Sequence, residues 1–190
     1  MGAAIVGVKE LRALPYSDWT DETRNAARNV YGVIDHILLR LYTGAELRGQ
    51  FQEQGAEPLT HEQRGVYYST IQPLLQQAVT FLEDAEHGLI VASTAHYLME
   101  LLAGVVSYDP VGVLRMAYRI ALAAEKTGYT TDGMAVQEVV NLVETILANH
   151  ASVVREGEPL QDLLGLLTCF AKIGWPEALR LVWRLDELFK

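Results

Sequence analysis

The sequence has one cysteine, Cys169, among its 190 residues, and it has no long uninterrupted apolar run. A single cysteine excludes an intrachain disulfide and a cysteine zinc cluster within one chain, and it is typical of a reducing compartment. No stretch approaches the ~18 apolar residues of a membrane-spanning helix. The apolar start, Met1 to Val8, lacks a positively charged n-region and is followed at once by Lys9 and Glu10, which argues against a secretory signal. We therefore expect a soluble, cytoplasmic protein.

Basic residues are also scarce. The chain has 15 basic and 24 acidic residues, a net charge of −9, and no run of lysine or arginine. Nucleic-acid-binding surfaces need clustered positive charge, so a nucleic acid is not the expected partner. The phosphate-binding patterns G-x-x-x-x-G-K-[ST] and G-x-G-x-x-G are absent, and so is the G-x-S-x-G elbow of a nucleophilic serine. The sequence thus predicts no catalytic residue and no cofactor.

What the chain does have is apolar periodicity. Half of the residues are hydrophobic, which at this length is enough for a sizeable core in one domain. From Ser17 onward they recur at helical spacing, which predicts an all-α fold for a single domain over residues 1–190. We expect an extended N-terminal segment over 1–17, N-terminal helices over 18–55 and three helix pairs over 60–190. The N-terminal helices comprise one over about 18–42 and a short amphipathic piece around Leu47 and Phe51.

One predicted helix contains a proline. Thr60 and Gln63 form a capping-box pattern at its start, and its apolar stripe runs toward Glu86. Pro73 inside this stretch has no amide proton to donate to the carbonyl four residues back. The sequence therefore predicts either a kink or a break into two helices at Pro73.

The predicted helix starts recur at regular intervals. One series of starts, 49 residues apart, comprises Thr60, Asp109 and Glu158. A second series, 44 residues apart, comprises Gly88, Asp132 and Pro176. This spacing is similar to the ~40 to 47 residues of HEAT and armadillo repeats, and the resemblance implies antiparallel helix pairs stacked as a short right-handed α-solenoid. A plain helical bundle would show the same apolar stripes, so the two architectures stay open.

One arrangement of side chains has the character of a metal site. Glu83 with His87, and His96 with Glu100, are each four residues apart and so share one helix face. If their helices form a tight hairpin, the pairs converge, and the alternative function is a helical-bundle enzyme that binds a metal or small ligand. Di-metal carboxylate sites, however, use Glu and His three residues apart plus further glutamates. We therefore predict that these four residues hold no metal.

Cys169 stands in an apolar stretch, between Leu167 and Phe170. Apolar surroundings favour the neutral thiol over the reactive thiolate. The sequence thus predicts a buried, chemically inert cysteine.

Arginines occur as pairs four residues apart on three predicted helices: Arg24 with Arg28, Arg115 with Arg119, and Arg180 with Arg184. Like charges at this spacing are mildly destabilising, so something compensates them. One interpretation is pairing with acids of the chain, such as Glu125, Asp186 and Glu187. The other, for the last two pairs, is a binding surface for an acidic partner peptide.

The last predicted helix carries more apolar surface than one stripe, because Trp183, Leu185, Leu188 and Phe189 surround it. An exposed apolar patch of this kind marks an interface. The sequence therefore predicts a non-catalytic helical-repeat interaction or scaffold module, or the regulatory part of a larger protein, that forms a homodimer or binds another chain or domain. The candidate protein-binding residues are Arg115, Arg119, Arg180, Arg184, Trp183 and Phe189.

Overall fold

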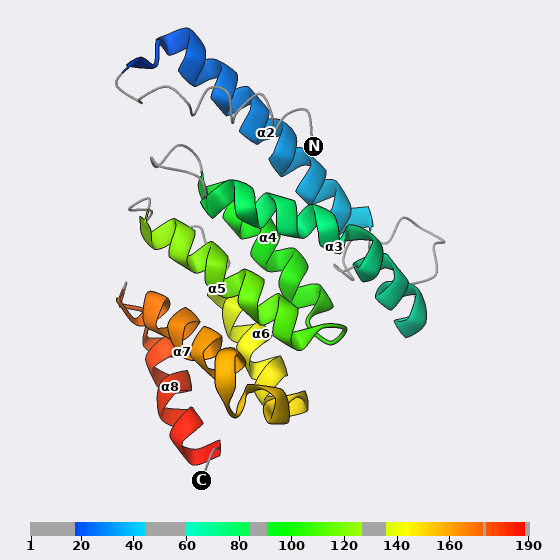
Figure 1. Cartoon of the computed structure of the whole chain (residues 1–190), viewed down its shortest axis with the longest axis vertical. Helices are drawn as coiled ribbons and strands as arrows, with labels where there is room; N and C mark the ends of the chain where they lie inside the picture. The colour runs from blue at the N-terminus through cyan, green and yellow to red at the C-terminus, as the bar shows by residue number, and fades with distance from the viewer. Residues whose placement is uncertain (1–17, 45–59, 84–90, 127–135, 173, 189–190) are drawn as a thin grey trace.

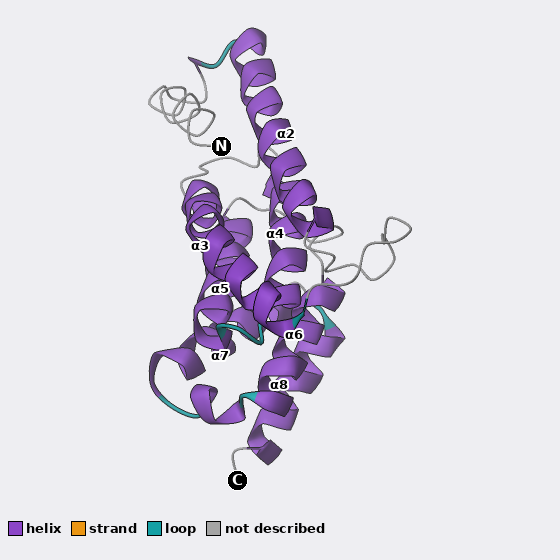
Figure 2. Cartoon of the chain, turned by 90° about the vertical axis from the view of Figure 1, so that its right-hand side faces the viewer, coloured by secondary structure: helices purple, strands orange, loops and turns teal. Residues whose placement is uncertain are grey.

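The computed structural model describes residues 18–44, 60–83, 91–126, 136–172 and 174–188. All regular structure in these ranges is helical, which confirms the predicted all-α class (Figure 2). The helices are α2 (Asp21–Gly44), α3 (His61–Glu83), α4 (Val91–Val105), α5 (Pro110–Lys126), α6 (Val136–Asn149), the 3-10 helix η2 (Ala151–Val154), α7 (Gly157–Lys172) and α8 (Pro176–Leu188). The expected segment over 1–17, the piece around Leu47, and the starts at Gly88 and Asp132 lie outside the described residues. Within the described ranges no helix is both long enough and apolar enough to span a bilayer.

The capping signals at Thr60 and Asp109 act as the sequence predicts. The Thr60 amide donates to Oε1 of Gln63 at 2.8 Å, and the Gln63 amide donates to Oγ1 of Thr60 at 3.2 Å. This reciprocal pair satisfies two amides at the start of α3 that have no partner within the helix. At the start of α5 the Gly112 amide donates to Oδ1 of Asp109 at 2.9 Å. Local sequence therefore determines where these two helices begin.

The end of α7 is set by Gly174. This residue has a φ of 84°, a left-handed conformation that glycine adopts without steric cost. The Gly174 amide donates to the Ala171 carbonyl at 3.0 Å, and the Trp175 amide donates to the Phe170 carbonyl at 3.2 Å. These two bonds form a Schellman motif, which reverses the chain so that α8 begins at Pro176.

α3 continues through Pro73 as a single helix, so of the two predicted outcomes the break into two helices is wrong, and a kink within one continuous helix remains compatible. Pro73 deprives the Ser69 carbonyl of its usual amide donor. Both residues lie on the exposed side of α3, where water can hydrate that carbonyl. On the opposite side Ile71, Leu75 and Ala78 are buried, so packing holds the helix together.

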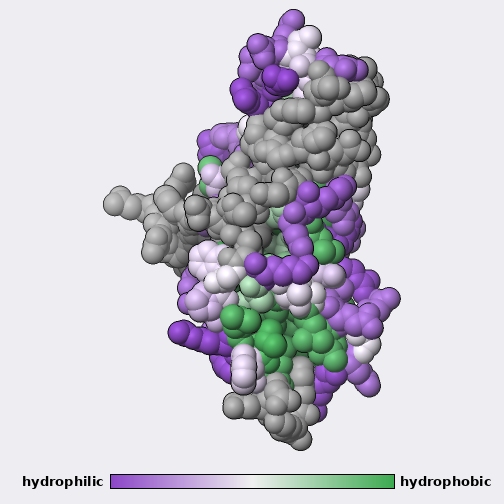
Figure 3. All heavy atoms as spheres, turned by 90° about the vertical axis from the view of Figure 1, so that its left-hand side faces the viewer, coloured by the Kyte–Doolittle hydropathy of each residue, from purple (hydrophilic) through white to green (hydrophobic). Residues whose placement is uncertain are grey.

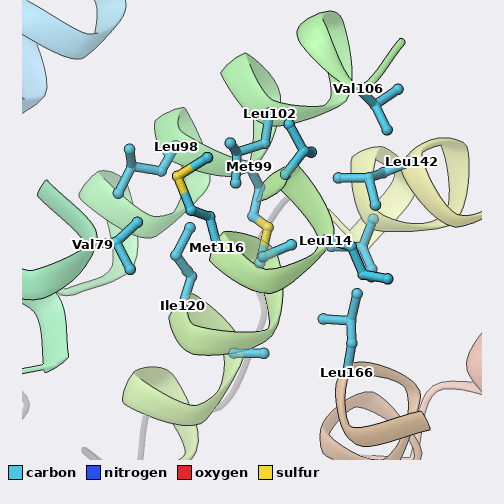
Figure 4. Packing of buried hydrophobic residues seen from close by; sticks show 14 of the residues in the cluster. Val79, Leu98, Met99, Leu102, Val106, Leu114, Met116, Ile120, Leu142 and Leu166 are labelled. Carbon is cyan, nitrogen blue, oxygen red and sulfur yellow. The ribbon is translucent and has the colours of Figure 1, made fainter. Parts of the chain in front are cut away.

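α5 lies at the centre of the molecule. It contacts α3 and α7, and it also contacts α4 and α6, while α2 packs on α4 and α8 packs on α7 (Figure 1). Buried side chains of α3 to α7 belong to one cluster, among them Val79, Met99, Met116, Leu142 and Leu166 (Figure 4). α2 and α8 lie at opposite ends of the long axis (Figure 1). The predicted helical-bundle alternative is compatible with this arrangement.

A glycine sets how closely α7 approaches α5. A Cβ atom at Gly165 would lie 2.4 Å from Cζ of Tyr118 on α5, well inside van der Waals contact. The Tyr118 ring therefore occupies the space that a larger residue at position 165 would need. A Cβ atom at Gly32, in α2, would have no neighbouring atom within 4 Å, so Gly32 provides a matched comparison.

We expect the two glycine-to-alanine substitutions to have opposite signs. Gly165→Ala lowers the free energy of unfolding by about 1–3 kcal/mol, because the new methyl group displaces the Tyr118 ring. Gly32→Ala raises it by about 0.5–1 kcal/mol, because alanine is the better helix former and nothing is in its way. Urea denaturation of the two variants checks this, and a stabilised Gly165→Ala protein would contradict the close packing.

Candidate functional site

The two candidate binding arginines on α5 are engaged within the chain. Nε of Arg115 donates to Asp162 at 3.2 Å, and its Nη2 donates to Glu158, so both of its partners lie on α7. Arg119 donates to both carboxylate oxygens of Glu83 on α3, with Nε 2.6 Å from Oε1. These hydrogen bonds raise the pKa of both guanidinium groups. At Arg115 and Arg119 the charge is therefore balanced by acids of neighbouring helices.

The two candidate arginines on α8 are less fully engaged. Nη1 of Arg184 donates to Oε1 of Glu144 on α6 at 2.9 Å, and 54% of the Arg184 side chain remains exposed. Arg180 is exposed and makes no ion pair with any residue that the structure describes. Phe189 and the side chains of Asp186 and Glu187, which the sequence offered as a binding residue and as acid partners, lie outside the described part.

Apolar side chains are exposed on the outer side of α8. Trp183 is 77% exposed and Leu179 is 47% exposed, and their spacing of four residues places them on one helix face. We call Leu179, Arg180, Trp183 and Arg184 the α8 surface. Figure 3 shows hydrophobic residues gathered on the C-terminal part of the molecule. Trp183 is therefore a large aromatic side chain that the described helices leave uncovered.

Helical spacing in the sequence predicts a core stripe for α8 on Leu179, Val182, Leu185 and Leu188, and Leu179 is the member that is wrong. Leu185 is buried and Val182 packs against the core as expected, whereas Leu179 is exposed and Ala178 and Leu181 are buried. Neighbouring helix positions are about 100° apart, so a buried side that begins at Ala178 leaves Leu179 outside the core and next to Trp183. The predicted surplus of apolar surface is present as Trp183 with Leu179, while Leu185, which the prediction also counted in it, is buried.

An apolar pocket lies between α6, α7 and α8. Its lining includes Val136, Val140, Leu167, Phe170, Trp175 and Leu181. Because all of these side chains are apolar, the pocket offers no group for proton transfer or metal binding. It marks an apolar region beside α8 rather than a reaction site.

The described members of the two Glu–His pairs, Glu83, His96 and Glu100, are not grouped as metal ligands. Glu83 is bound by Arg119, and His87 lies outside the described residues. On α4, Nε2 of His96 is 3.6 Å from Oε1 of Glu100, whose side chain is buried. Among the residues that the structure describes, no three or more His, Cys, Asp or Glu side chains are grouped as metal ligands.

Cys169 is buried, as the sequence predicts, with 7% of its surface exposed. Its thiol donates to Oε2 of Glu125 at 3.3 Å, and Lys172 donates to the other oxygen of that carboxylate at 2.6 Å. Burial, reinforced by Glu125, raises the pKa of the thiol to about 11 from the ordinary value of 9.0. The thiolate is therefore scarce at neutral pH.

No protein-family model, no curated protein and no solved structure matches this chain. Its function is therefore argued from its own residues. Among the features described above, the α8 surface combines a large exposed aromatic residue with arginines, and these residue types dominate binding energy at protein interfaces.

We expect alkylation of Cys169 in the native protein to be slow at neutral pH and to accelerate as the pH approaches about 11. Because the folded pKa is raised, this cysteine stabilises the fold below pH 9.0 and loses that contribution as the pH rises toward about 11. Glu125→Gln removes one cause of the shift, so it should lower the pKa and speed the reaction. Thiol labelling followed by mass spectrometry tests this, and fast labelling at neutral pH would contradict it.

Proposed function

We propose that this chain is a non-catalytic helical-repeat module that acts by binding another protein chain, and that the α8 surface makes the contact. The observation that carries the proposal is the exposure of Trp183, at 77%, beside Leu179. Covering such side chains removes apolar area from water at about 25 cal/mol per Å². Arg180 and Arg184 border the patch and supply hydrogen-bond donors at its rim.

We also propose that the helix pairs stack as a short, right-handed, HEAT- or armadillo-like α-solenoid. Support comes from the contacts between alternate helices: α5 touches both α3 and α7, and α4 touches both α2 and α6. In such a stack each helix pair buries its apolar side on the next pair. α8, at one end of the long axis, would then offer its outer face to a partner (Figure 1).

The setting that fits this function is the cytoplasm. The single cysteine, Cys169, fits a reducing compartment. A partner chain is expected to be either a second copy or a different protein. No observation on the described residues favours the alternative enzyme built on the two Glu–His pairs.

We expect Trp183→Glu to abolish association, because a carboxylate buried in the contact without a partner costs several kcal/mol. Val66→Glu is the control, since Val66 is 64% exposed on α3, outside the α8 surface. Light scattering of the protein and its complexes should give a mass above the 21.1 kDa chain for the wild type and Val66→Glu, but not for Trp183→Glu. A strictly monomeric wild-type protein that recovers no partner would overturn the proposal.

A further inference from the structure

We infer that the segment docking on the α8 surface is an amphipathic helix with acidic side chains along the edge of its apolar stripe. This inference rests on the proposed function, and it adds the shape and the charge of the partner. It follows from the spacing of Leu179 and Trp183 along α8 and from the small number of ion pairs that the two neighbouring arginines make.

The shape of the α8 surface favours a helix. Leu179 and Trp183 are separated by one helical turn, about 6 Å along the axis, so they form a ridge of the kind that packs into the groove of another helix. Addition of a β-strand is the main alternative for binding a peptide, but it requires an exposed sheet edge. The described ranges contain no strand, and their core is built by helix-on-helix packing throughout.

The charge of the partner follows from a comparison of four arginines. Arg115 has two carboxylate partners and Arg119 has a bidentate one. Arg184 has a single ion pair through one nitrogen, and Arg180 has none with the described residues. Guanidinium nitrogens that remain open to solvent match carboxylates in geometry and charge. Of these four arginines, the two with open donors are therefore the ones on α8, beside the exposed tryptophan.

An anionic membrane is a weaker match to the same residues. A membrane-surface helix has many basic residues on its polar face, whereas the α8 surface, as far as the structure describes it, has two, Arg180 and Arg184. A short acidic helix, in contrast, can pair its carboxylates with these two arginines alone.

Two synthetic peptides test the inference on the full-length protein. Both have about 20 residues and leucines at helical spacing on one face. One carries glutamates beside this stripe and the other carries lysines. Titration followed by calorimetry and by tryptophan emission should show the glutamate peptide binding at least about tenfold more tightly, with affinity falling as salt is added.

Reversing the charge of an arginine on α8 should shift the binding preference from the glutamate peptide toward the lysine peptide. Arg180→Glu is expected to weaken binding of the glutamate peptide by about tenfold and to strengthen binding of the lysine peptide. Arg28→Glu is the control, because Arg28 is exposed on α2 at the opposite end of the long axis (Figure 1). It should leave both affinities unchanged.

Three results would overturn the inference. Equal binding of the two peptides would show that charge does not select the partner. If neither peptide binds while the protein forms a dimer that Trp183→Glu dissociates, a second copy occupies the surface and the proposed function still holds. Binding to phosphatidylserine vesicles in preference to either peptide would assign the surface to a membrane and would remove both proposals.

Discussion

The structure depends on burial of each helix against its neighbours, and α5 is the helix that makes this possible. Its apolar residues meet α3, α4, α6 and α7 in one core. Close approach is achieved where side chains are small, as at Gly165 beneath Tyr118. Asp109 adds a polar link, because the same carboxylate that caps α5 accepts hydrogen bonds from Tyr68 and Gln72 of α3. The described neighbours of α8 leave Leu179 and Trp183 exposed, so this helix does not hide all of its apolar surface.

This packing also explains why arginines of similar spacing have different roles. Arg115 and Arg119 lie on the central helix, within reach of acids on both neighbouring helices, so their ion pairs tie α5 to α7 and to α3. Arg180 and Arg184 lie on α8, which has α7 as its main neighbour, and among the described residues their one acid partner is Glu144 of α6. The position of a helix in the array therefore decides how many acids of neighbouring helices its arginines can reach.

Features coded by adjacent residues could be predicted from the sequence, and features that depend on distant residues could not. The Thr60–Gln63 box and the starts at Asp109 and Pro176 rest on local hydrogen bonding and backbone restriction, and the structure has them where they were expected. At Pro73 the local sequence left a kink and a break open, because the packing that carries α3 across this residue as one helix comes from other helices. Leu179 was misassigned because a stripe shifted by one residue is equally periodic. The acid partners of Arg115 lie 43 and 47 residues away, a distance that no local pattern encodes.

The central claim is that each helix is buried by its neighbours and that α8 keeps part of its apolar surface exposed. Hydrogen–deuterium exchange measured for each residue tests this claim most directly. The account predicts that α5 amides are the most protected, and that α8 amides exchange through a local opening that binding of a partner suppresses. If the α8 and α5 amides exchanged together, in one global unfolding step, α8 would be packed as firmly as the central helix. That result would contradict the account, because α8 would then need no partner to cover it.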